Sequence, residues 1–174
     1  ALSRDKLDAI RAGFDDIHFT MDNCPNQAIL FGTKDRIDAL EAAVVAEGAV
    51  CTRLPISWGY HTEYVRPMAE GFRALFDRVT FQPSDVTLWS CATAQPFPGD
   101  KAAALETAVT QYVSQVRFTG AIQNLYDAGH RIFVECGPSA NLTAFVRDIL
   151  GRQPHLAVEA DNKRRGFLSQ LRHV

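Results

Sequence analysis

Long hydrophobic runs are missing from this sequence, and neither sign of charge is in clear excess. Even the longest apolar runs are short, such as the Ala and Val residues at 42–46, so no segment is predicted to span a bilayer. Lys and Arg number 18 against 20 Asp and Glu, which gives a formal net charge of -2. Nucleic-acid-binding proteins usually carry a basic excess, so neither nucleic acid nor a membrane is an expected partner.

A secretory signal is also missing near residue 1. Ser3, Arg4, Asp5 and Lys6 interrupt the chain before any apolar core of the kind that a signal peptide needs. The expected location is therefore cytoplasmic.

Closely spaced cysteines and cofactor motifs are absent as well. The four cysteines, at positions 24, 51, 91 and 136, form no C-x-x-C pair, so no zinc or redox site is predicted. We expect buried, reduced thiols instead. No phosphate loop, G-x-G-x-x-G, H-E-x-x-H or EF-hand pattern occurs, and no metal site is predicted.

The first part of the chain, by contrast, has clear local signals for a small α+β unit. Ser3 as a cap and Gly13 as a stop indicate a helix, and apolar and polar residues alternate at 17–21 before turn chemistry at 22–26. The predicted elements are a helix at 3–12, strands at 17–21 and 27–31, a helix at 34–47 and a strand at 49–56. This order predicts a ferredoxin-like small subdomain over residues 1–57 that lacks its first strand.

From residue 58 onward, helices and strands alternate, which is typical of the edge of a parallel α/β sheet. The predicted helices are at 62–78, 102–112, 119–128, 139–150 and 167–174, and the predicted strands are at 86–91, 131–136 and 156–159, with a loop at 93–100. The predicted fold class is therefore α/β, with an α+β small subdomain followed by an α/β portion over residues 58–174.

His61 is the first candidate for a functional side chain. It lies where a predicted strand ends and a predicted helix begins, a place that fixes the backbone and exposes the side-chain tip. The alternative is a histidine that only makes a local hydrogen bond. The case for a functional role is weaker for the remaining histidines, which lie on a predicted strand, in a turn or toward the chain end, at positions 18, 130, 155 and 173.

Cys136 is the second candidate, because a thiol between a strand and a helix N-terminus can be an activated nucleophile of a hydrolase. No basic residue is adjacent in sequence, which disfavours this role. The run 137–141 is superficially similar to a G-x-S-x-G elbow, but Asn141 replaces the final glycine. Pro138 and Ser139 fit a helix entry and an N-cap instead.

Four blocks resemble segments of the malonyl-CoA:acyl-carrier-protein acyltransferases. Residues 23–32 are similar to that family's N-x-P-x-Q-x-V-[VI]-x-G strand, and residues 54–62 to its L-x-V-S-x-x-x-H-[ST] segment. Residues 116–119 and 133–143 resemble its P-V-R-F and V-E-V-G-P-x-x-x-L-T blocks. The blocks occur in the family's order over roughly residues 15–165. Among members of the family, the sequence resembles acyltransferase domains of polyketide and polyunsaturated-fatty-acid synthases.

The resemblance implies a fold, a reaction and partners. Residues 58–174 would be the C-terminal part of an α/β-hydrolase-like large subdomain with its following linker. A serine in G-H-S-x-G is acylated by malonyl-CoA and passes the acyl group to the phosphopantetheine thiol of an acyl carrier protein. No cofactor is implied beyond these substrates. The implied partners are the carrier protein, the N-terminal remainder of the domain and neighbouring synthase domains.

The resemblance also implies roles for five residues. His61 matches the histidine that activates the serine, and Gln111 lies where the family's orienting backbone carbonyl is expected. The predicted contact joins His61 Nδ1 to the main-chain oxygen of Gln111. Asn23, Trp58 and Tyr60 are implied to bind substrate, with Asn23, Tyr60 and His61 facing one cleft.

Two departures from the family pattern bear on function. The sequence has no G-H-S-x-G, so we expect no self-acylation by this chain alone. The alternative function is a non-catalytic or degenerate scaffold that docks a carrier protein. Malonyl-selecting members tend to have H-A-F-H and methylmalonyl-selecting members Y-A-S-H. Here Tyr60 favours malonyl, whereas Trp58 fits neither pattern and leaves the choice open.

Overall fold

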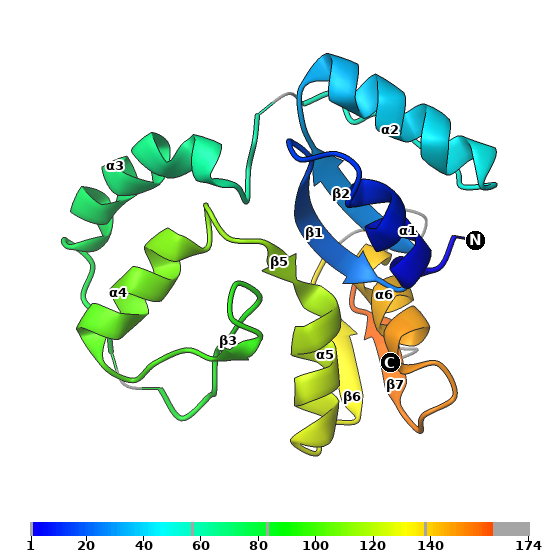
Figure 1. Ribbon diagram of the computed structural model, residues 1–174. Helices are drawn as coiled ribbons and strands as arrows, with labels where there is room; N and C mark the ends of the chain where they lie inside the picture. The colour runs from blue at the N-terminus through cyan, green and yellow to red at the C-terminus, as the bar shows by residue number, and fades with distance from the viewer. Residues whose placement is uncertain (1, 57, 83, 138, 162–174) are drawn as a thin grey trace.

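The computed structural model describes residues 2–56, 58–82, 84–137 and 139–161. Its N-terminal unit is an antiparallel hairpin packed with two helices (Figure 1). Ser3 starts the first helix because its hydroxyl accepts a hydrogen bond from Lys6 N. The elements are α1 (Arg4–Arg11), β1 (His18–Cys24), β2 (Gln27–Phe31) and α2 (Lys34–Ala46), with Ile17, Leu40 and Val44 buried between them. The predicted helix–strand–strand–helix order is confirmed.

The strand predicted at 49–56 is not formed. In the described part of the chain no strand pairs with this segment, and Val50, Leu54 and Ile56 are exposed. A strand needs a neighbour for its backbone N–H and C=O groups, and an apolar pattern does not supply one. The expectation of a third strand in the small subdomain was therefore wrong for these residues.

A strand that the sequence did not predict joins the hairpin instead. β5 (Val116–Arg117) pairs parallel with β1, and the resulting sheet has the order β2-β1-β5. This sheet combines residues from both sides of the boundary predicted at residue 57, a position that lies outside the described residues. The two-part division of the chain stays a prediction.

The middle of the chain forms a helical pair, on the left in Figure 1. A 3-10 turn, η1 (Glu63–Val65), leads into α3 (Arg66–Phe76), which packs on α4 (Lys101–Thr110). The helix predicted at 62–78 is shorter and begins as this tighter turn, with a proline in the first turn of α3. The pair buries Val65, Ala69, Val109 and Val113, and the ring of Phe72 stacks on Tyr112 at 4.8 Å between centroids.

The strand predicted at 86–91 is only two residues long. β3 (Trp89–Ser90) pairs antiparallel with β4 (Gln95–Pro96), in a segment that was predicted to be a loop. Beyond this pair, Phe97 N donates a further backbone hydrogen bond to Leu88 O at 2.7 Å, so the missing N–H of Pro96 does not interrupt the contact between the two segments.

The C-terminal region contains the parallel pair that the sequence predicts. β6 (Ile132–Glu135) and β7 (Leu156–Glu159) pair in parallel register, and α6 (Asn141–Leu150) connects them. The preceding helix, α5 (Phe118–Asp127), packs with α6 around buried Ile122, Val146, Leu150 and Ala157. The mixed α/β class is therefore confirmed.

One detail of this region corrects the sequence analysis. α6 begins after Ala140, whose φ of 56° is left-handed, and Ser139 is not its N-cap. Pro138 and the closing helix predicted at 167–174 lie outside the described residues. No helix within the described ranges is long and apolar enough to cross a membrane.

Candidate functional site

A tight turn, here called the His61 turn (residues 58–62), presents His61. Thr62 is buried, and its hydroxyl donates to the carbonyl of Gly59 at 2.5 Å and accepts from Tyr64 N at 3.3 Å. Gly59 is buried against the ring of Phe31 on β2, where a methyl group would lie 2.8 Å from Phe31 Cε1. The turn is therefore fixed both by its own hydrogen bonds and by the hairpin.

His61 is tied to the C-terminal end of α4 by two hydrogen bonds. Its backbone N–H donates to Tyr112 O at 2.9 Å, and its Nδ1 lies 2.9 Å from Gln111 O. The predicted contact with the Gln111 carbonyl is confirmed. Carbonyl groups at a helix C-terminus have no partner within the helix, so α4 offers acceptors at this end without losing bonds of its own.

This contact determines the tautomer of the ring. A carbonyl oxygen can only accept, so Nδ1 must carry the hydrogen and Nε2 is the acceptor in the neutral imidazole. In the described part of the structure no hydrogen bond reaches Nε2. His61 also has a φ of 63°, in the left-handed region that a residue with a side chain rarely occupies.

Such backbone strain persists only where the surroundings impose it, and it is concentrated at functional sites. Here the bonds to Tyr112 and Gln111 impose it.

Two exposed aromatic rings lie beside His61 in the same turn. Trp58 and Tyr60 stack with their centroids 6.4 Å apart and an interplanar angle of 23°. Trp58 is 65% exposed, which leaves a flat apolar surface open on the same turn as His61. Large exposed aromatic surfaces of this kind are suited to binding a ligand.

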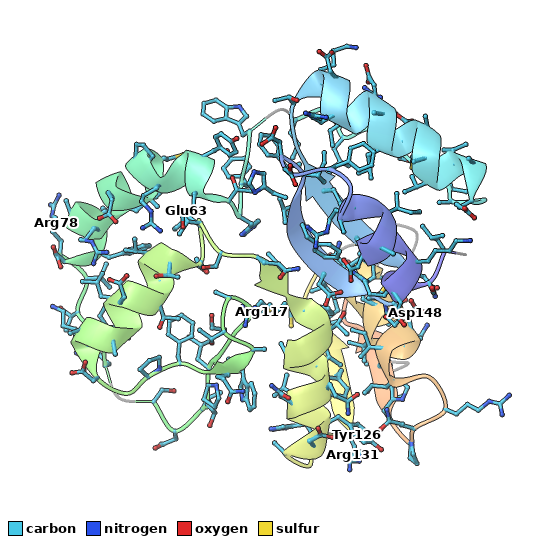
Figure 2. All side chains as sticks on the ribbon, in the orientation of Figure 1. Glu63, Arg78, Arg117, Tyr126, Arg131 and Asp148 are labelled. Carbon is cyan, nitrogen blue, oxygen red and sulfur yellow. The ribbon has the colours of Figure 1, made fainter. Side chains whose placement is uncertain are left out.

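Tyr64 and Phe31 are site residues that the sequence analysis missed. The Tyr64 ring contacts His18 of β1 and Phe31 of β2 edge-on, with centroid distances of 5.4 and 5.7 Å. They join the His61 turn to the hairpin. Figure 2 labels Glu63, which immediately precedes Tyr64, near the start of α3. The aromatic content of 58–64 was the available signal, but only the folded chain places Phe31 against it.

Asn23 is not brought to the other predicted residues. It lies at the turn end of the hairpin, where its amide donates to Gln27 at 2.9 Å. The Gly59 contact is at Phe31, paired with His18 at the opposite end, about 17 Å away at 3.3 Å per residue. A substrate-binding role for Asn23 stays a prediction without a contact to support it.

The cysteines differ from the expectation of buried thiols. None forms a disulfide, but Cys51 and Cys136 are exposed, while Cys24 is buried and Cys91 half-buried. Burial raises the pKa of the Cys91 thiol, and burial, followed by a hydrogen bond with Asp148, raises the pKa of Cys24. Within the described ranges no base lies within hydrogen-bond distance of the Cys136 thiol, so its candidacy as a nucleophile gains no support.

No three His, Cys, Asp or Glu side chains in the described part of the chain are grouped so that they could hold a metal ion. The His61 turn and the end of α4 are therefore the candidate site.

Residues 1–165 match the family of acyl transferase domains, and the chain belongs to that family. The malonyl CoA-acyl carrier protein transacylase of Bacillus subtilis (strain 168) is 29% identical over 137 residues, which are 78% of this chain and 43% of that protein. The chain therefore spans less than half the length of this relative.

Solved structures of the family share the fold. The acyltransferase domain from the second module of the salinomycin polyketide synthase superposes with a TM-score of 0.81 at 25% identity, over 98% of this chain and 40% of that one. A complex of a type II polyketide synthase acyl-carrier protein with its malonyl-transacylase gives a TM-score of 0.81 at 18% identity. That match covers 100% of this chain and 56% of the other.

Proposed function

We propose that this chain supplies the histidine of an acyltransferase domain that transfers malonyl groups from CoA to an acyl carrier protein. The observation that carries the proposal is the double attachment of His61, through its backbone N–H and Nδ1, to the end of α4. It leaves Nε2 available to take a proton from a serine that another segment of the domain provides. Family membership and the malonyl-specific relative support the choice of substrate.

The proposed reaction has two halves. The serine hydroxyl attacks the malonyl thioester, its proton moves to His61 Nε2, and CoA leaves as a thiol with that proton. The phosphopantetheine thiol of the carrier protein then gives its proton to Nε2 and attacks the malonyl ester, and the serine recovers the proton. No further cofactor takes part in the proposed reaction.

The Gln111 carbonyl positions the ring rather than reacting. It keeps the hydrogen on Nδ1 and fixes the ring plane, as an orienting carboxylate does in a catalytic triad but without its full negative charge. Trp58 and Tyr60 would bind the acyl or pantetheine part of the substrate, since their stacked, exposed rings belong to the same turn as His61.

The test uses a complete domain that contains these 174 residues together with a Gly-His-Ser-x-Gly segment. His61→Ala should lower malonyl transfer about 10²–10⁴-fold, the usual contribution of a general base. Gln111→Ala should have little effect, because the acceptor is a main-chain oxygen that the substitution keeps. Equal losses in the two variants would contradict the proposed roles.

A second measurement separates this proposal from the scaffold alternative. The 174-residue chain incubated with malonyl-CoA should show no added mass, since it has no nucleophilic serine segment. If the complete domain also transfers nothing while it binds a carrier protein, the scaffold function holds instead.

A further inference from the structure

The candidate site is supported by two parts of the fold that come from different regions of the sequence. The end of α4 holds the ring and the backbone of His61 through the carbonyls of Gln111 and Tyr112. The hairpin of β1 and β2 holds the other side of the His61 turn, where Phe31 packs against Gly59. The geometry of the turn therefore depends on how the end of α4 is fixed relative to the hairpin.

A short parallel ladder makes this connection. Only residues 111–115 separate α4 from β5, and β5 pairs with β1 alone in the described part of the chain (Figure 1). The ladder has two residue pairs, Met21 with Val116 and Asp22 with Arg117, and Figure 2 labels Arg117 on this strand. Since so short a ladder has few backbone hydrogen bonds, side-chain contacts beside it should contribute to its stability.

The carboxylate of Asp22 provides such a contact. Its Oδ1 accepts a hydrogen bond of 2.9 Å from the hydroxyl of Thr119, which lies 3.4 Å from the main-chain oxygen of Asp22 as well. Thr119 is in the first turn of α5, directly beyond β5, where a negative charge is also favourable. This bond therefore ties the chain that follows β5 to β1.

Arg4 of α1 makes a second bond to the same carboxylate oxygen, at 2.8 Å. It also donates to Cys24 O at 2.9 Å, and its guanidinium carbon lies 4.5 Å from the centroid of the Phe19 ring. These contacts join α1 to β1. Arg4 and Thr119 thus bond the same oxygen of Asp22 but come from different parts of the fold.

We propose that Asp22 is a positioning residue of the acyltransferase site and that it acts through its bond to Thr119. By holding β5 on β1, this bond fixes the end of α4 relative to the hairpin and so keeps the Gln111 carbonyl at His61 Nδ1. The bond to Arg4 stabilises the fold but does not contribute to this positioning. The inference rests on the proposed function in taking His61 as the general base.

Asp22 does not itself lie at the His61 turn. It is four residues along β1 from His18, whose ring contacts Tyr64 beside the turn. That separation is about 13 Å at 3.3 Å per residue. A change at Asp22 should therefore leave substrate binding unchanged and alter only the alignment of the His61 ring.

The test compares two substitutions that each remove one bond to Asp22 Oδ1, in the complete domain with its Gly-His-Ser-x-Gly segment. Thr119→Val keeps the shape of the side chain and removes its hydroxyl. It should lower kcat about ten- to a hundredfold, the effect of a misaligned catalytic group, with the KM for malonyl-CoA unchanged. Arg4→Met keeps an unbranched side chain beside Phe19. It is the matched control and should keep the wild-type kcat.

Two further variants test the route through the hydroxyl. Thr119→Ser keeps the hydroxyl and should keep kcat. Asp22→Ala should lower kcat as Thr119→Val does, and the double variant should lose no more than either single one, because both remove the same bond. Multiplied losses, or an equal loss in Arg4→Met, would overturn the proposal. Circular dichroism at the assay temperature shows which variants are folded, and the two Thr119 variants decide the matter if Asp22→Ala is not.

The ring of His61 gives a measurement that does not depend on transfer. Nitrogen-15 NMR of the imidazole should show the hydrogen on Nδ1 alone in the wild-type domain and in Arg4→Met. Thr119→Val should show a mixture of the Nδ1 and Nε2 tautomers, because the Gln111 carbonyl no longer holds the hydrogen at Nδ1. An unchanged tautomer in Thr119→Val would overturn the proposal.

The two measurements also separate this inference from the proposed function. A tautomer change in Thr119→Val, together with no effect of His61→Ala on transfer, would contradict the proposed function and leave the positioning role of Asp22 standing. Loss of transfer in His61→Ala, together with wild-type kcat and an unchanged tautomer in Thr119→Val, would overturn the positioning role alone.

Discussion

Gly59 is the residue whose size controls how closely the His61 turn approaches the hairpin. Its missing side chain lets the Phe31 ring and the Thr62 hydroxyl occupy the space where a Cβ would be. The Phe31 ring is itself held by contacts with His18 and Tyr64, so it cannot move away without loss. The position of His61 therefore depends on the absence of a side chain at residue 59.

Gly59→Ala should destabilise the protein by about 1–3 kcal/mol, the usual cost of overpacking a tight site. Gly71→Ala is the matched control. It lies within α3 with nothing within 4 Å of the added methyl group, and it should stabilise by about 0.5–1 kcal/mol through helix propensity. Urea unfolding followed by circular dichroism measures both, and equal effects of the two substitutions would refute the steric argument.

The four thiols should react with iodoacetamide in the order of their exposure. Cys51 and Cys136 should be labelled first at pH 8, and Cys24 and Cys91 last. Burial raises the pKa of Cys91, so a smaller fraction is thiolate at this pH, and only the thiolate is nucleophilic. Mass spectrometry of tryptic peptides over time measures the order. Early labelling of Cys91 would show that the region around β3 opens readily.

At the scale of elements, α4 is the support of the candidate site. Its C-terminal carbonyls hold His61, and its N-terminus is capped by Asp100, whose carboxylate accepts from Ala103 N at 2.9 Å. The helix is also packed on α3 through Val109. Weakening either the cap or the packing on α3 should make the position of the His61 ring less fixed.

Asp100→Ala should cost about 0.5–2 kcal/mol of stability, because it removes both a capping bond and a negative charge from the helix N-terminus. Thr33→Ala provides the comparison. Thr33 is the N-cap of α2 but its side chain makes no capping bond, so its replacement should cost less. Thermal unfolding of the two variants measures both losses of stability. A larger loss in Thr33→Ala than in Asp100→Ala would contradict the capping role of Asp100.

At the scale of the whole molecule, the buried apolar residues of the described ranges form separate clusters rather than one continuous core. One lies between α3 and α4, one around α5, α6 and β7, and one between the hairpin and the N-terminal helices. Small clusters of this kind open independently when little packing connects them. The chain by itself should therefore show regional stability.

Leu150→Ala, at a site only 2% exposed, should remove about 2–5 kcal/mol from the cluster around α6. Amide exchange should then accelerate in α5, α6 and β7 and stay nearly unchanged in α3 and α4. Val109→Ala, in the other cluster, should give the opposite pattern. Uniform acceleration in both variants would indicate a single cooperative unit.

Local sequence alone determined the elements whose signals come from neighbouring residues. Capping by Ser3, the turn chemistry at 22–26 and the apolar run before Gly137 predicted α1, β2 and β6 close to their observed bounds. The elements depend on periodicity and caps, which a linear chain displays. The contact between His61 and the Gln111 carbonyl was predicted in another way, from the resemblance to a family in which an orienting carbonyl follows the histidine by about 50 residues.

Only the tertiary structure decided the features that join distant residues. Residues 49–56 have a strand pattern but no neighbouring strand in the described structure to receive their hydrogen bonds, whereas β5 becomes a strand because β1 lies beside it. Asn23 and His61 belong to two blocks of the same family pattern, yet Asn23 lies at one end of the hairpin and the His61 turn contacts the other. The left-handed φ of His61 follows from bonds to residues some fifty positions away. Backbone pairing and ring contacts depend on the path of the chain in space, and no local pattern specifies that path.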